Sequence, residues 1–129
     1  MARQFVVQLK NQPGALAVLA EALAARGVDL RAIGGGGIGD SGHVIMTTAD
    51  DDTARAVLDE ADYTYIEGES IIAEVLDRPG GMAAVTRDLA DAGVNIAGHL
   101  FLGRWGDRAM FTFVVDKPDV ARPILERKP

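Results

Sequence analysis

The chain carries one motif twice, at a fixed offset. Residues 11–16, Asn-Gln-Pro-Gly-Ala-Leu, return at residues 77–82 as Asp-Arg-Pro-Gly-Gly-Met. Without a gap, residues 27–30, Gly-Val-Asp-Leu, return at residues 93–96 as Gly-Val-Asn-Ile. The offset is 66 residues, from 79 minus 13 for the two prolines. An internal repeat of this length predicts two copies of one structural unit.

Each copy of the repeat is small, about half of the chain. We expect one module over residues 1–68 and another over 69–129. Modules of this size are near the lower limit for an independent core, so we expect them to pair side by side within the chain into one continuous sheet.

A net charge of −6 and a pI near 4.8 argue against a nucleic-acid binder. Cysteine is absent, which excludes disulfides and thiolate metal sites. The sequence shows neither a signal peptide nor a membrane span, so we expect a cytoplasmic protein.

The first copy is predicted to fold as strand, helix, strand, strand, helix, strand. Apolar and β-branched runs favour strands, and apolar residues at helical spacing favour helices. The strands are expected at residues 5–9, 28–33, 44–48 and 63–66, and the helices at residues 15–26 and 53–60. Four glycines at residues 34–37 are expected to break the pattern as a bulge or a close approach of two backbones.

The second copy repeats this order but stops before its last strand. Its strands are expected at residues 70–75, 95–102 and 109–115. Its first helix is expected to follow residue 81, and its second helix lies within residues 116–127. The later matches hold at an offset of 67, so one residue is inserted between the second and third strands. Two such units predict an α+β protein with ferredoxin-like βαββαβ modules.

The missing strand leaves an edge to be covered. In this fold the fourth strand flanks the first, so residues 70–75 are expected to have one unpaired side. An apolar edge without proline is rarely left open. We therefore expect a second copy of the protein to cover it, which gives a homodimer, with the tail at residues 126–129 as the other candidate.

The junctions between the first strand and first helix of each copy are candidate ligand sites. Asn11 or Asp77 lies two residues before a proline, and a glycine follows at the start of the helix. The first N–H groups of a helix lack internal partners and attract anions such as an amino-acid carboxylate. The alternative is structural: Pro-Gly makes a tight turn, and Asn11 or Asp77 caps the helix.

Both copies resemble the ACT domain family. The resembling residues are 9–16 with 27–30, and 75–82 with 93–96. The resemblance covers nearly the whole chain as a tandem pair. It implies a small-molecule sensing module, most often for amino acids, with ligands between the first loop of one domain and the second strand of its neighbour. Since the chain has no room for a catalytic domain, it resembles the stand-alone tandem type.

The resemblance also implies which residues contact the ligand. Pairing within the chain would place Asn11 opposite Asn95, in a neutral pocket. It would place Asp77 opposite Asp29, where two carboxylates repel each other unless a cation lies between them. His99, on the second strand of the second copy, is a further candidate. The complete expected set is Asn11, Gln12, Pro13, Gly14, Asp29, Asp77, Arg78, Gly80, Asn95 and His99.

One departure from the family concerns the nature of the pocket. The family often has a His two residues before the loop Asn or Asp, and the chain has Leu9 and Val75 there. This departure implies a more apolar pocket.

Two functions remain open at this point. The leading interpretation is a non-catalytic regulatory module that binds a small amino acid or similar metabolite between its modules, without cofactor or metal and with a metabolic enzyme as a candidate partner. The alternative is an interaction subunit without a ligand that docks on a metabolic enzyme. The sequence contains no Ser-His-Asp set, Cys nucleophile or spaced acid-base pair, so we do not expect an enzyme.

Overall fold

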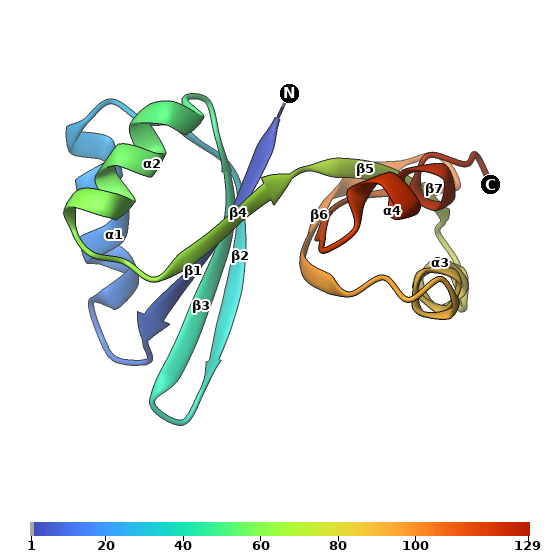
Figure 1. Cartoon of the computed structure of the whole chain (residues 1–129), viewed down its shortest axis with the longest axis horizontal. Coiled ribbons are helices and arrows are strands. Elements are labelled where there is room, and N and C mark those ends of the chain that lie inside the picture. The colour runs from blue at the N-terminus through green and yellow to red at the C-terminus, as the bar shows by residue number, and fades with distance from the viewer. Residues whose placement is uncertain (1) are drawn as a thin grey trace. The chain divides into compact units, whose positions relative to one another are not determined.

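The computed structural model describes residues 2–129 and divides them into two compact units, 2–68 and 69–129. The first unit contains β1 (Arg3–Lys10), α1 (Ala15–Ala25), β2 (Leu30–Ile38), β3 (Ser41–Thr48), α2 (Asp51–Glu60) and β4 (Tyr65–Glu69), whose last residue, Glu69, belongs to the second unit. Its strands form one sheet in the order β2-β3-β1-β4. Both helices cover the same face of this sheet (Figure 1).

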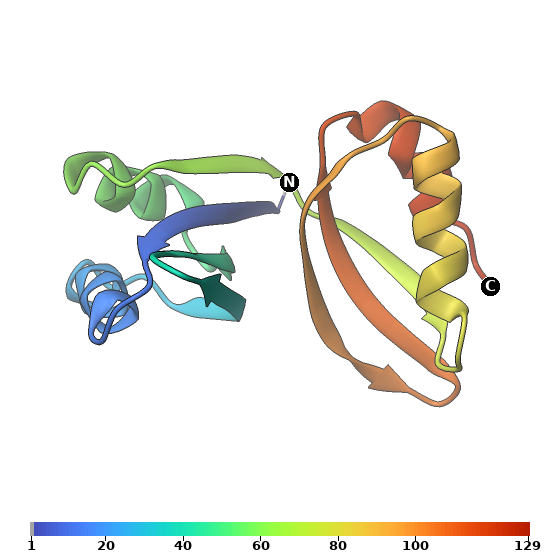
Figure 2. The ribbon, with the colours of Figure 1, turned by 90° about the horizontal axis from the view of Figure 1, so that it is seen from below.

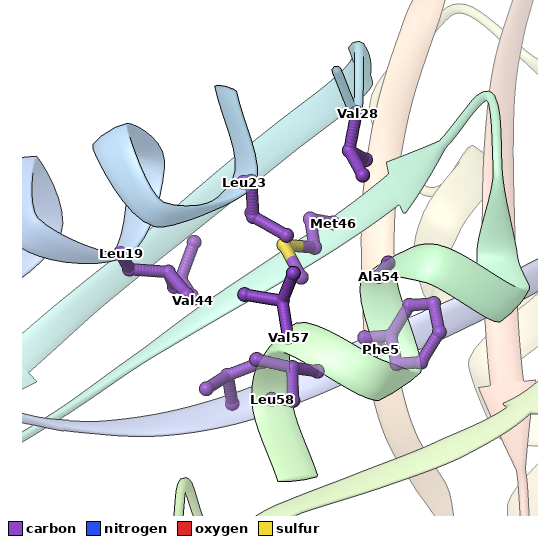
Figure 3. Close-up of a cluster of buried hydrophobic side chains, with 10 residues drawn as sticks. Phe5, Leu19, Leu23, Val28, Val44, Met46, Ala54, Val57 and Leu58 are labelled. Carbon is purple, nitrogen blue, oxygen red and sulfur yellow. The ribbon is translucent and has the colours of Figure 1, made fainter. Parts of the chain in front are cut away.

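The core of the first unit lies between the sheet and its two helices. Phe5 is opposite Met46, and Val7 is opposite Val44, across the antiparallel strands β1 and β3. Residues directly opposite each other point to the same face, so these four side chains meet the helices. Each fully buried side chain of this kind contributes roughly 1.5–3 kcal/mol. The buried cluster (Figure 3) consists of Phe5, Val7, Leu19, Leu23, Val28, Val44, Met46, Ala54, Val57 and Leu58.

The second unit repeats this plan with three strands. It contains β5 (Ile71–Leu76), α3 (Gly81–Asp91), β6 (Ile96–Trp105), β7 (Arg108–Val115) and α4 (Pro118–Leu125). The strand order is β5-β7-β6, and α3 and α4 lie on one face of the sheet (Figure 2). Its buried cluster consists of Ile71, Ala73, Leu89, Val94, Phe113, Ala121 and Leu125.

The strand registers show how the two copies correspond. A bulge between Leu30 and Ala32 in β2 recurs between Ile96 and Gly98 in β6, at the offset of 66. β6 then has a second irregularity between Phe101 and Gly103. The extra residue of the second copy is therefore in this bulge, and later positions match at an offset of 67.

The α+β class and the βαββαβ order of the first unit are confirmed, and two finer expectations were wrong. Residues 34–37 do not end the strand, because β2 continues through them in register with β3. The expected close approach of two backbones is present at Gly35, where a Cβ would lie 2.3 Å from the His43 carbonyl oxygen. The strands are hydrogen-bonded into two sheets rather than one continuous sheet. The side-by-side placement of the modules stays a prediction. None of the helices within residues 2–129 is long and apolar enough to cross a membrane.

Candidate functional site

A hollow of about 430 Å³ lies beside the loop that joins β1 to α1 in the first unit. We call it the glycine hollow. It is lined by residues 9–12, 15–16, 33–37 and 42–44. Its volume is within the range of small-molecule pockets in proteins.

Glycines on β2 and β3 create the floor of the glycine hollow. Gly35 is opposite Val44, and Gly37 is opposite Gly42. Because Val44 belongs to the core between sheet and helices, these glycine positions share its face. A Cβ atom at Gly37 would meet the Asn11 side chain, whereas one at Gly35 would lie 2.3 Å from the His43 carbonyl oxygen. Without side chains at these positions, this part of the sheet is uncovered.

Asn11 fixes the loop at one end of the glycine hollow. Its Nδ2 donates a hydrogen bond of 2.9 Å to the carbonyl oxygen of Gly39, and its backbone N–H donates one of 3.0 Å to that of Asp40. A Cβ atom at Gly37 would lie 2.6 Å from the Asn11 Cγ. Glycine at position 37 is thus what allows the Asn11 side chain to lie across the hairpin. The suggestion that Asn11 caps the helix was wrong.

The start of α1 has no side-chain cap. Gly14 occupies the N-cap position in the left-handed conformation, with φ 85°. The N–H groups of Leu16 and Ala17 have no acceptor within residues 2–129. By contrast, α2 is capped by Asp50, whose carboxylate accepts from the Thr53 N–H at 3.1 Å. Unpaired N–H groups and the positive end of the helix dipole make the α1 terminus suited to a carboxylate.

The matching loop of the second unit is arranged differently. Asp77 keeps the backbone bond of Asn11, since its N–H donates to the carbonyl of Asp107 at 2.9 Å. Its carboxylate, however, pairs with Arg104 Nε at 2.9 Å. The Arg104 guanidinium also lies 4.8 Å from the ring centroid of Phe101. Arg104 thus supplies Asp77 with a cationic partner from within the second unit.

The remaining predicted residues have different surroundings within their own units. Gln12 lines the glycine hollow, whereas Arg78 and Gly80 line another hollow of about 490 Å³ in the second unit. Asp29 is exposed, with its carboxylate 3.6 Å from Arg31 Nε. The Asn95 N–H donates to Asp116 at 2.8 Å.

His99 has an exposed side chain on β6, with its ring centroid 6.4 Å from that of Phe113. The pairings of Asn11 with Asn95 and of Asp77 with Asp29 join the two units and stay predictions. Within residues 2–129, no group of three or more His, Cys, Asp or Glu side chains is placed to hold a metal ion.

The sequence analysis did not identify three residues that distinguish the two loops in the structure: Gly37, Phe101 and Arg104. The usable signal was the match between residues 39–40 and 106–107, which are Gly-Asp in both copies. That match places the inserted residue before the hairpin turn and makes Arg104 the counterpart of Gly37.

Comparison with known proteins identifies the fold. No protein-family model matches the chain, and no curated protein matches it. Protein BT0572 from Bacteroides thetaiotaomicron matches with a TM-score of 0.73 and 22% identity, over 97% of this chain and 86% of that one. The ligand-free regulatory subunit of aspartate kinase from Thermus thermophilus matches with a TM-score of 0.61 and 20% identity, over 96% and 89%. The regulatory subunit of aspartate kinase from Thermus flavus matches with a TM-score of 0.62 and 19% identity, over 96% of this chain and 89% of that one. The chain therefore has the ACT-like α+β fold of these regulatory subunits.

Proposed function

We propose that this protein is a non-catalytic tandem ACT module that binds a small amino acid or similar zwitterion and regulates a metabolic enzyme. The observation that carries the proposal is the glycine hollow, where an uncapped helix terminus, a fixed amide and an apolar lining meet. These are the three kinds of group that an amino acid requires: one for its carboxylate, one for its ammonium and one for its side chain.

The ligand's charged groups are matched by named atoms of the first unit. Its carboxylate accepts hydrogen bonds from the N–H groups of Leu16 and Ala17 at the start of α1. Its ammonium donates to Asn11 Oδ1, because the amide nitrogen of Asn11 is already used by Gly39. Losing one hydrogen bond to a charged group typically costs about 1.5–3 kcal/mol.

The likeness to regulatory subunits of aspartate kinase supports the regulatory part of the proposal. A module of this type changes the activity of an enzyme by binding its ligand with different affinity in two states of the complex. The alternative, a ligand-free subunit that only docks on an enzyme, shares this fold. Ligand binding distinguishes the two.

Thermal-shift screening of the common amino acids, followed by calorimetry, tests the proposal. A ligand that binds the folded state raises the melting temperature. Asn11→Ala should weaken binding at least about tenfold, whereas Glu21→Gln, an exposed change on α1 outside the glycine hollow, should leave it unchanged. The melting temperature of each variant without ligand controls for folding. No shift with any amino acid would favour the alternative.

A further inference from the structure

The two units carry different residues at the positions that surround the glycine hollow. In the first unit Gly35 is opposite Val44 on the helix-covered face of the sheet. In the second unit Phe101 is opposite Phe111 at the matching positions. After the bulge in β6, Arg104 takes the place of Gly37. The second unit thus has the side chains of Phe and Arg at two positions where the first unit has glycine.

In the second unit these two side chains occupy the space in question. The ring centroid of Phe101 lies 5.5 Å from that of Phe111 at an angle of 60°, a usual aromatic packing geometry. Arg104 lies over the Phe101 ring and pairs with Asp77. Phe101 remains 47% exposed, so its position is accessible from solvent.

In the first unit the corresponding apolar surface has no cover. Leu16 of α1 and Ile33 of β2 line the glycine hollow and are 49% and 47% exposed. A phenyl-sized apolar group placed where Phe101 lies in the second unit would cover them. Removing such surface from water is favourable in proportion to its area.

We infer that the ligand is an amino acid with a large apolar side chain that takes the place of the missing Phe101 side chain, and that the second unit closes its own site with Phe101 and Arg104. This inference rests on the proposed function and deepens it. It assigns one ligand to each chain, held by the first unit. It also assigns selectivity to Gly37, since a side chain there would enter the space that the ligand needs.

Calorimetry with L-phenylalanine, L-leucine and glycine tests both selectivity and stoichiometry. One molecule of L-phenylalanine or L-leucine should bind per chain, and glycine should bind at least about tenfold more weakly, because each buried methylene adds affinity. Two molecules per chain, or equal affinity for glycine, would overturn the inference while leaving the proposed function intact. If none of the common amino acids binds, both fail.

A pair of variants closes the hollow deliberately. Gly37→Arg should lower affinity for L-phenylalanine at least about tenfold, because the new side chain fills the space and displaces the Asn11 side chain. Asn11→Asp with Gly37→Arg rebuilds the ion pair of Asp77 with Arg104, and it should keep the unliganded melting temperature without restoring binding. Gly35→Phe is unsuitable, because a Cβ there would lie 2.3 Å from the His43 carbonyl oxygen. Undiminished binding by a folded Gly37→Arg protein would overturn the inference.

Discussion

Arg55 of α2 donates two hydrogen bonds to the carboxylate of Glu67 on β4, 2.5 Å from Nε to Oε1 and 2.7 Å from Nη2 to Oε2. Arg3 adds a third contact at 3.1 Å. In the second unit Arg122, 67 positions after Arg55, pairs with Glu69, which lies 66 positions after Arg3. The repeat thus preserves an arginine on the second helix of each unit, and each arginine pairs with a carboxylate of its own unit.

Glu67 should make the stability of the first unit depend on acid pH. The hydrogen bond from Arg55 holds the pKa of Glu67 below its usual value of 4.5; burial opposes this shift, and Arg3 adds to it. A lowered carboxyl pKa adds stability that is present above pH 4.5 and is lost as the pH falls through the folded pKa. Glu67→Gln should therefore lower the urea midpoint at pH 7, and the difference should shrink at pH 3.

Glu60→Gln serves as the control for this measurement. Glu60 pairs with Arg26 at 2.8 Å, but both side chains are exposed, and exposed pairs add little stability. Its midpoint should match the wild type at both values of pH. A constant deficit of Glu67→Gln across this range would show that the ion pair is not the cause.

The left-handed glycine before α1 should tolerate no side chain. Gly14 has φ 85°, and Gly80 has φ 89° at the matching place in the second unit. A side chain in this conformation costs about 1–2 kcal/mol, so Gly14→Ala should lower the free energy of unfolding by about that amount. Gly36→Ala is the matched control, since no atom lies within 4 Å of its Cβ position and its φ is not left-handed. Equal losses in both variants, measured by urea unfolding, would contradict this explanation.

Two leucines one turn apart on α1 should separate stability from binding. Leu19 is 1% exposed in the core, and Leu19→Ala should cost about 2–5 kcal/mol. Leu16 is half-exposed in the glycine hollow, and Leu16→Ala should stay within about 0.5 kcal/mol of wild type. In calorimetry, however, Leu16→Ala should weaken binding of L-leucine and L-phenylalanine. A large loss of stability in Leu16→Ala would place that side chain in the core instead.

The helices could be predicted from the sequence because their apolar residues repeat at helical spacing, and Leu19, Leu23 and Leu89 are indeed buried. Leu16, one turn before Leu19 on α1, is half-exposed, because it lines the glycine hollow, where the glycines provide no side chain to pack against. A run of glycines has no side-chain pattern, so residues 34–37 were mistaken for a break. They are in fact a strand, held by its pairing with β3.

The site was less predictable than the fold because it depends on register. Sequence indicated the loops of Asn11 and Asp77, but not what their side chains bind. Which residue of β6 is extra depends on the bulge between Phe101 and Gly103. An alignment without that bulge does not match Arg104 with Gly37, so the ion pair of Arg104 with Asp77 could not be predicted from the sequence.

The edge of β5 should mediate dimer formation. β5 pairs with β7 on one side and has no strand on the other within residues 2–129. Its sequence, residues 71–76, lacks proline and is apolar except for Glu74, which pairs with Lys128, and such edges readily pair with another chain. We predict that sedimentation at micromolar concentration gives twice the monomer mass of 13.6 kDa. Ile72→Lys places a charge on this strand and should shift the protein toward monomer, whereas Val120→Lys, an equally exposed position on α4, should not. A wild-type protein that sediments as a monomer would show that this edge stays unpaired in solution.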